Sequence, residues 1–347
     1  MKVAIVFNEA YPEIKDAYET HIPKELGFKP YFAITEYDPI NEYESIAAAL
    51  RKGGMDAYIL NVMDDLNTFI EDYKKNKPDV IFNLVEIFRD QPRLETAFTG
   101  LFELMGIAYT GASPLALATC QNKTLTKRIV SAFGIRTPKF KFIDEIKTSY
   151  KHGLHYPVIV KPAWEDASVG IENESIVLNH FDLIKRIEYV FCEYKQPVLL
   201  EEFIQGRELN VAVFGDNEPK ALPISEIDFS KMPAHLYNIV SYQAKWDPFH
   251  EAYHKTIPIC PARLSNKIRK EAEKMAIACF KAMGCRDYAR IDMRLSKNDG
   301  QLYVLEVNPN PDLTEDAGLM RSSRQAGISY RKTLKKIVEF AYQRRKK

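Results

Sequence analysis

The chain has 347 residues, of which 46% are hydrophobic and 27% charged, and it is longer than one compact core usually holds. Lysine and arginine number 48 against 47 aspartate and glutamate, so no charge excess points to nucleic acid or a membrane surface as a partner. No apolar run is long enough to cross a bilayer, and the start, MKVAIVFNEAYPE, has no cleavage site and is typical of a strand rather than a signal peptide. We therefore expect a cytoplasmic protein of two or three domains whose five scattered cysteines are free thiols.

The first third of the chain alternates strand-like and helix-like segments. Apolar runs at 2–8, 56–60 and 79–84 are typical of buried strands. Segments 41–52 and 94–105 have helical periodicity and end at glycines. This rhythm predicts a small parallel sheet with helices on its faces.

The rest of the chain changes to strand pairs with fewer helices between them. We expect helices at 122–133, 181–194, 265–283 and 330–345, and strands at 139–142, 156–161, 197–204, 209–214, 289–295 and 301–307. Segments 197–204 and 209–214 are predicted to form a strand pair, and the Asn-Asp-Gly turn at 298–300 predicts a hairpin between the last two strands. The sequence thus predicts separate α/β and α+β domains.

The last hairpin carries side chains suited to a metal. On a strand, residues two apart share a face, so Arg290 lies with Asp292, and Glu306 lies with Asn308. Pairing of the strands can bring Asp292, Glu306 and Asn308 together, and their oxygens are hard ligands that suit Mg²⁺ shared with phosphate. A solvated sheet surface is the alternative for most hairpins, but here the strand runs into Asn-Pro-Asn-Pro, which is unusual for an exposed strand end.

Two further segments suggest a phosphate and nucleoside site. Lys161 ends a strongly apolar strand, where a buried ammonium needs a partner such as phosphate. The loop 163–170 could fold over phosphates, although a single glycine does not by itself identify such a loop. Glu201 and Glu208 could hold adenine and ribose hydroxyls, but for these acids taken alone a solvated turn is the simpler interpretation.

In their order along the chain, these segments resemble the ATP-grasp D-alanine–D-alanine ligase family, and the likeness covers nearly the whole chain. The matching segments are DVIFN (79–83), GIAYTG (106–111), NKTLTK (122–127), PVIVKP (157–162), SVG (168–170), GRE (206–208) after Glu201, SEI (225–227), YQAKW (242–246), ARID (289–292), LEVN (305–308) and QAGISY (325–330).

The resemblance implies a fold and an activity. The fold is α/β and α+β: a three-domain ATP-grasp fold with an N-terminal Rossmann-like (pre-ATP-grasp) domain at 1–111, a central ATP-grasp subdomain at 112–201 and a C-terminal ATP-grasp subdomain with the metal site at 202–347. The implied activity is an ATP- and Mg²⁺-dependent carboxylate–amine ligase, in which ATP phosphorylates a carboxylate and an amine then attacks the acyl phosphate. The implied substrates are small amino acids or peptides, with no nucleic acid or membrane partner, and a homodimer is expected.

The resemblance also assigns roles to individual positions. Those that would contact ATP are Lys123 and Lys161 at the phosphates, Lys245 at the γ-phosphate, Ser168 in the loop, Glu201 and Glu208 at adenine and ribose, and the backbone of Glu202, Phe203 and Ile204 as the adenine hinge. Those that would bind two Mg²⁺ ions, with Mn²⁺ as an alternative, are Asp292, Glu306 and Asn308. Arg290 would steady the developing tetrahedral centre, and Lys245 and Ser168 would join it as catalytic positions.

The substrate side departs from the family pattern. Where the family has a glycine-rich first loop with a glutamate, this chain has Asn-Glu-Ala-Tyr-Pro-Glu, so that Glu13 or Glu9 is the candidate for holding an ammonium. Glu86 replaces a histidine, Asp312 replaces a glycine and Trp246 replaces a tyrosine.

A pocket for a carboxylate that gains acids is poorly suited to D-alanine. Glu86 and Asp312 therefore lead to the hypothesis of a different acceptor, either cationic or lacking that carboxylate. The alternative is that the two acids pair with Arg89, Arg93 or Arg321 and do not touch substrate.

Three rival interpretations remain. His250, Glu251 and His254 form a literal H-E-x-x-H, with Glu273 as a candidate third zinc ligand, but prolines on both sides leave about two helical turns where a metallopeptidase needs a long helix. A nucleotide-binding homologue without ligase activity is the second, although all three lysines and all three metal positions are present. The third is an ATP-grasp ligase that joins an amine to a peptide tail or other metabolite.

Overall fold

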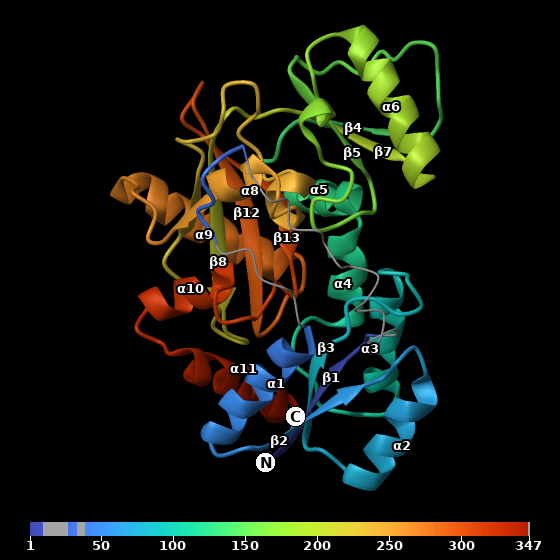
Figure 1. Cartoon of the computed structure of the whole chain (residues 1–347), viewed down its shortest axis with the longest axis vertical. Helices are drawn as coiled ribbons and strands as arrows, with labels where there is room; N and C mark the ends of the chain where they lie inside the picture. The colour runs from blue at the N-terminus through green and yellow to red at the C-terminus, as the bar shows by residue number, and fades with distance from the viewer. Residues whose placement is uncertain (10–26, 33–38, 346–347) are drawn as a thin grey trace.

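The computed structural model describes residues 1–9, 27–32 and 39–345, and its strands form three sheets (Figure 1). None of the helices in these ranges combines the length and apolarity needed to cross a membrane.

The first sheet is parallel and has the strand order β2-β1-β3. Its strands and neighbouring helices are β1 (Lys2–Phe7), α1 (Pro39–Lys52), β2 (Asp56–Asn61), α2 (Leu66–Asn76), β3 (Val80–Leu84) and α3 (Leu94–Leu104). Val3 and Ile5 of β1 belong to the core shared with α1 and the C-terminal helix α11 (Tyr330–Arg344), whereas Ala4 and Val6 face the aromatic side chains of α2 and α3. Burial on both faces explains why this strand is apolar from Val3 to Phe7.

The second sheet is antiparallel, with the order β4-β7-β5-β6. Its elements are β4 (Phe140–Ile143), β5 (Val158–Pro162), β6 (Ile176–Val177), α6 (His180–Tyr194) and β7 (Val198–Glu202). Helix α6 covers one face, where Val158 and Val160 are buried. Because side chains alternate along a strand, Lys161 of β5 and Glu201 of β7 project from the opposite face.

The third sheet has the order β11-β10-β8-β12-β13, with β9 also paired to β8. Its strands are β8 (Gly206–Phe214), β9 (Lys220–Ala221), β10 (Ser225–Asp228), β11 (Ile257–Ile259), β12 (Tyr288–Ser296) and β13 (Leu302–Asn308). Helices α5 (Lys123–Ala132) and α9 (Asn266–Ala282) pack on one face, and the other face is rich in charged side chains. The remaining helical elements are α4 (Pro114–Gln121), the 3-10 turn η2 (Asn173–Ser175), α7 (Tyr242–Trp246), α8 (Glu251–Lys255) and α10 (Gly318–Gln325).

The predicted pairing of segments 197–204 and 209–214 is wrong. Strand β7 pairs with β4 and β5, whereas β8 pairs with β10 and β12 in the larger sheet. The chain crosses between the sheets at Gly206, whose φ of 154° lies outside the range that L side chains favour. A Cβ there would collide with the carbonyl of Leu295, so glycine allows β8 to start directly beside β12.

The predicted hairpin of β12 and β13 is confirmed, and it contains a bulge. Arg290 is opposite Asn308 and Asp292 is opposite Glu306, after which the register shifts so that Met293 is opposite Val304. Strict alternation would place Val304 and Glu306 on one face. The extra residue lets Val304 stay in the core while Glu306 turns to the charged face.

Candidate active site

Lysines from two elements converge on the charged face of the third sheet. Asn122 caps α5 by accepting a hydrogen bond from Leu125 N at 3.0 Å, which makes Lys123 the first helical residue. The Lys123 ammonium donates to Glu306 Oε2 at 3.2 Å. Burial lowers the pKa of Lys161 to about 8, against the attraction of the nearby Glu306 carboxylate. The structure therefore brings both predicted phosphate lysines to the predicted metal ligands.

The side chains of Asp292, Glu306 and Asn308 form one connected set. Asn308 Nδ2 donates to Asp292 Oδ2 at 2.9 Å and to Glu306 Oε1 at 3.3 Å, and Arg290 holds Asp292 with two bonds of 2.8 Å. Burial raises the pKa of Asp292 despite this arginine. Burial also opposes the charge of Glu306, but Lys123, Arg290 and Lys161 outweigh it and hold its pKa well below the usual range.

This set fits a divalent cation. Two carboxylates and one amide from adjacent strands point to the same place, and hard oxygen ligands of this kind suit Mg²⁺. Rotating the Asn308 amide replaces its nitrogen by its oxygen on the side that faces both carboxylates. Asn210 of β8 also donates to Asp292 Oδ1 at 2.7 Å, which sequence analysis missed, although its place two residues after Glu208 on the same strand face could have indicated it.

Glu201 lies between two lysines. Its carboxylate is 2.5 Å from Lys127 Nζ and 2.6 Å from Lys161 Nζ, and its side chain is 1% exposed. Lys127 Nζ also donates to Thr137 Oγ1 at 2.8 Å. Sequence analysis assigned no role to Lys127, although it lies one helical turn after Lys123 on α5.

Of the positions predicted for adenine and ribose, Glu208, Phe203 and Ile204 lie around Arg294. Glu208 Oε2 accepts a bond of 2.7 Å from Arg294, and burial raises the pKa of this carboxyl. The Arg294 guanidinium lies 5.0 Å from the ring centre of Phe203 and donates to the carbonyl of Ile204 at 3.2 Å. Glu202 instead turns its carboxylate to the backbone and ring of His155.

The loop that contains Ser168 is tied to α7. Ala167 and Ser168 both have positive φ, and the Ser168 hydroxyl donates to Val240 O at 2.9 Å. Trp246 Nε1 donates to Ala167 O at 2.8 Å, and the Lys245 ammonium lies 5.0 Å from the Trp246 ring centre. Burial lowers the pKa of Lys245, and repulsion from Arg290 adds to this effect. Ser168, Lys245 and Trp246 thus lie together.

The acids that depart from the family pattern also lie near Lys245. Burial raises the pKa of Glu86 to about 7 even though part of its surface reaches solvent, and Asp312 adds repulsion while Lys245 opposes it. Asp312 accepts bonds from the backbone and hydroxyl of Thr314 at 2.8 and 2.9 Å. Within the described residues, neither acid forms an ion pair with the three arginines named as alternative partners: Arg89, Arg93 and Arg321.

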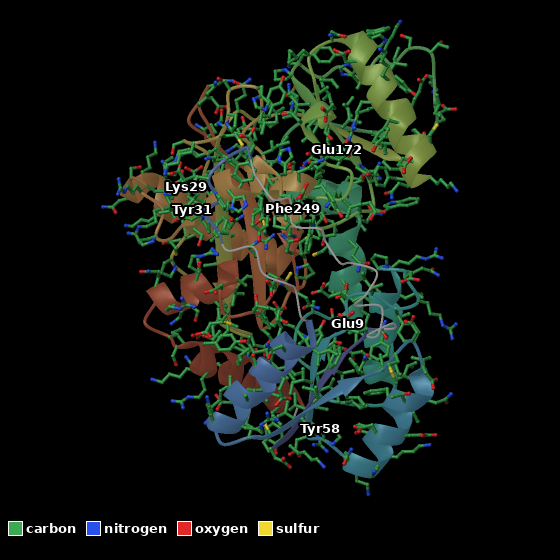
Figure 2. The ribbon with its side chains drawn as sticks, in the orientation of Figure 1. Glu9, Lys29, Tyr31, Tyr58, Glu172 and Phe249 are labelled. Carbon is green, nitrogen blue, oxygen red and sulfur yellow. The ribbon has the colours of Figure 1, made fainter. Side chains whose placement is uncertain are left out.

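Of the two acids predicted to hold an ammonium in the first loop, the structure describes only Glu9. Glu13 lies outside the described residues. Glu9 lies at the end of β1 that points toward the other two sheets (Figure 2), where its backbone is bonded to Asn61 and its carboxylate accepts from Tyr43 at 3.1 Å.

The H-E-x-x-H segment has another structural use. Helix α8 has only five residues, and His254 Nδ1 accepts bonds from the backbone of Tyr31 and Phe32 at 3.0 and 3.1 Å. His254 Nε2 contacts Pro248 O at 2.8 Å, so both ring nitrogens are engaged within the fold. Glu273 bonds Arg269 at 3.3 Å.

Comparison with known proteins places this site in a family. Residues 129–339 match the family described as D-ala D-ala ligase C-terminus. A D-alanine–D-alanine ligase of Carboxydothermus hydrogenoformans is 33% identical over 259 residues, which cover 72% of this chain and 78% of that protein. The uncharacterized protein y4sG of Sinorhizobium fredii is 29% identical over 349 residues, which cover 99% of this chain and 98% of that protein.

A solved structure shares the fold over the full length. The crystal structure of the D-alanine–D-alanine ligase from Bacillus anthracis complexed with ATP has a TM-score of 0.71 and 24% identity, and the match covers 100% of this chain and 99% of that one. Because more than half of the chain matches the family and a named ligase is similar over most of its own length, this chain belongs to the ATP-grasp D-alanine–D-alanine ligase family.

Proposed function

We propose that this chain is an ATP- and Mg²⁺-dependent ligase that joins a carboxylate to an amine through an acyl phosphate. The observation that carries the proposal is the convergence of Lys123 and Lys161 on the set formed by Asp292, Glu306 and Asn308. Cations beside hard oxygen ligands suit phosphates that share a divalent metal. The named ligases among the relatives and the ATP complex of the Bacillus anthracis enzyme support this proposal.

In this proposal, residues of the second and third sheets bind ATP together. Lys123, Lys161 and Lys245 would neutralise the phosphates, and the loop with Ser168 would cover them. Glu201, Glu208 and the backbone of residues 202–204 would hold adenine and ribose beside the apolar cluster of Ile159, Ile176 and Ile239. Asp292, Glu306 and Asn308 would hold two Mg²⁺ ions, or Mn²⁺, which supply positive charge at the phosphate oxygens.

Arg290 is suited to the step that forms the new bond. Two of its five N–H donors are bonded to Asp292, which fixes the guanidinium, and the others, which have no partner among the described residues, would donate to the developing oxyanion. The Trp246 bond to Ala167 would keep the phosphate loop closed while the acyl phosphate exists, which excludes water from it.

A second candidate concerns the acceptor amine. Glu86 and Asp312 lie within electrostatic reach of each other and of Lys245, and within the described residues no arginine forms an ion pair with either acid. Two acids at the acceptor side favour a cationic amine over a substrate that presents a carboxylate. We propose a basic amino acid or diamine as the acceptor class.

The test is phosphate release from ATP and Mg²⁺ with amino acids and diamines, singly and in pairs, and with D-alanine alone. Release only with pairs that include a cationic amine supports both proposals. Release with D-alanine alone at a comparable rate keeps the ligase and overturns the cationic acceptor. If no pair releases more phosphate than an Asp292→Asn control, the ligase proposal fails.

A further inference from the structure

The literal H-E-x-x-H segment joins two parts of the chain that are far apart in sequence. We name residues 27–32, between β1 and α1, the strap. The backbone N–H groups of Tyr31 and Phe32 donate to His254 Nδ1 at 3.0 and 3.1 Å, across 223 and 222 residues of chain. Figure 1 shows this short stretch beside α8, apart from the first sheet.

Aromatic packing surrounds the same histidine. The His254 ring centre lies 5.2 Å from that of Phe28 and 6.1 Å from that of Phe32, and Phe32 meets Tyr253 edge-on at 5.6 Å. The His254 side chain is 1% exposed. A buried imidazole with both nitrogens bonded is expensive to disturb, since a lost partner leaves a polar atom without water.

The hydrogen-bond pattern assigns the ring proton. Nδ1 accepts from two N–H donors and therefore carries no hydrogen, so Nε2 donates to Pro248 O at 2.8 Å. His254 thus holds the strap with one nitrogen and the turn between α7 and α8 with the other.

That turn leads directly to Lys245. Pro248 follows Trp246 by two residues, and Trp246 holds the phosphate loop through Ala167 O. The Thr256 hydroxyl, just after α8, donates to Tyr253 O at 3.1 Å and Ala244 O at 3.4 Å. A continuous set of contacts therefore runs from the strap through His254 to α7 and the loop.

We propose that His254 is a positioning residue: by clamping the strap to the turn after α7, it fixes Lys245 beside the phosphate loop. The inference rests on the proposed function for what Lys245 does, but the clamp itself is independent of activity. The H-E-x-x-H letters then reflect a structural clamp between distant segments.

Two amide variants of His254 distinguish the roles of the two ring nitrogens, because each amide takes the place of only one of them. In His254→Asn the amide oxygen can take the place of Nδ1 and accept from the strap, whereas in His254→Gln the amide reaches the Nε2 position and the strap loses its acceptor. Hydrogen–deuterium exchange of the full-length protein reads the amides of Tyr31 and Phe32 and those of α7 (Tyr242–Trp246). We expect His254→Gln to speed exchange in both segments by about tenfold or more, and His254→Asn, which keeps the acceptor for the strap but loses the donor to Pro248 O, to speed exchange in α7 while the strap stays near wild type.

A third variant disrupts the same contact from the side of the strap. Tyr31→Pro removes one donor and leaves His254 intact, and it should speed exchange in α7 as His254→Gln does. If His254→Gln leaves the strap as protected as wild type, or frees the strap without changing α7, the proposal is overturned.

Steady-state kinetics distinguish the positioning of Lys245 from a contribution of His254 to stability alone. With the substrate pair that releases phosphate fastest, we expect both His254→Gln and His254→Asn to lower kcat between about ten- and a hundredfold, with the KM for ATP nearly unchanged, because each variant keeps only one half of the clamp. A raised KM with unchanged kcat would overturn the positioning role. If no pair releases phosphate, the ligase proposal fails, and the exchange experiment still decides the clamp.

Discussion

Lys127 on α5 and Glu201 on β7 form an ion pair of 2.5 Å in which the two side chains are 2% and 1% exposed. Lys161 contacts the same carboxylate from β5 at 2.6 Å. The pair connects the helix that begins with Lys123 to the second sheet, so the orientation of the two proposed phosphate lysines, Lys123 and Lys161, depends on Lys127, to which the proposal assigns no contact with ATP.

Replacing Lys127 with methionine is expected to destabilise the protein. The Glu201 carboxylate keeps Lys161 but loses one of its two cationic partners in a buried site, at a cost of about 3 kcal/mol. Urea unfolding measures the change, and Lys274→Met, at an exposed position on α9, is the control. Equal stability of the two variants would show that the pair contributes little.

Glu306→Gln tests the metal set without changing the shape of the side chain. The variant loses the charge that faces Lys123 and one carboxylate ligand, so the Mg²⁺ concentration for half-maximal phosphate release should rise by about tenfold or more. The control is Glu193→Gln on the exposed side of α6. An unchanged Mg²⁺ titration would remove Glu306 from the metal site.

Trp246→Phe tests the contact between α7 and the phosphate loop. Phenylalanine keeps an aromatic ring near Lys245 but cannot donate to Ala167 O, and we expect the KM for ATP to rise about fivefold. The control is Phe181→Leu, which changes an exposed aromatic side chain on α6, outside the phosphate loop. Phe181→Leu should leave the KM for ATP unchanged, and the same effect in both variants would contradict a specific role for the Trp246 bond.

Glu95 makes stability depend on pH. Burial, with repulsion from Glu86, raises its pKa from 4.5 to about 8, against hydrogen bonds from Asn310 and Gln121. Between about pH 4.5 and pH 8, the Glu95 carboxyl is therefore protonated in the folded protein but ionised in the unfolded chain. This contribution to stability is complete below pH 4.5 and is lost as the pH rises toward about 8.

The matching variant is Glu95→Gln, which cannot ionise. Its free energy of unfolding, minus that of wild type, should increase steadily between about pH 5 and pH 8, by up to a few kcal/mol. Urea unfolding at several pH values measures this difference. Parallel profiles for the two proteins would show that Glu95 does not titrate in this range.

Glu86→Gln tests the cationic acceptor. Removing the charge should raise the KM for a basic acceptor by about tenfold and leave the KM for ATP unchanged, because the proposed function assigns Glu86 to the acceptor and not to ATP. Glu193→Gln again serves as the control. A variant that uses the basic acceptor as well as wild type would leave Glu86 without a part in recognition.

The sequence by itself determined most elements of the fold and the family. Local sequence patterns predict the strand β1, the helix α9 and the turn between β12 and β13, because hydrophobic periodicity and turn chemistry depend on residues that are close in sequence. The order of the motifs around Lys161, Asp292 and Asn308 was enough to indicate an ATP-grasp ligase.

Tertiary structure alone decided which segments meet. Alternation along β7 and β8 cannot tell whether two strands share a sheet, and they do not. Nor can it reveal the bulge that separates Val304 from Glu306. The Lys127–Glu201 pair and the His254 clamp join residues 74 and more than 220 positions apart, and such contacts depend on how whole sheets pack, which no local pattern encodes.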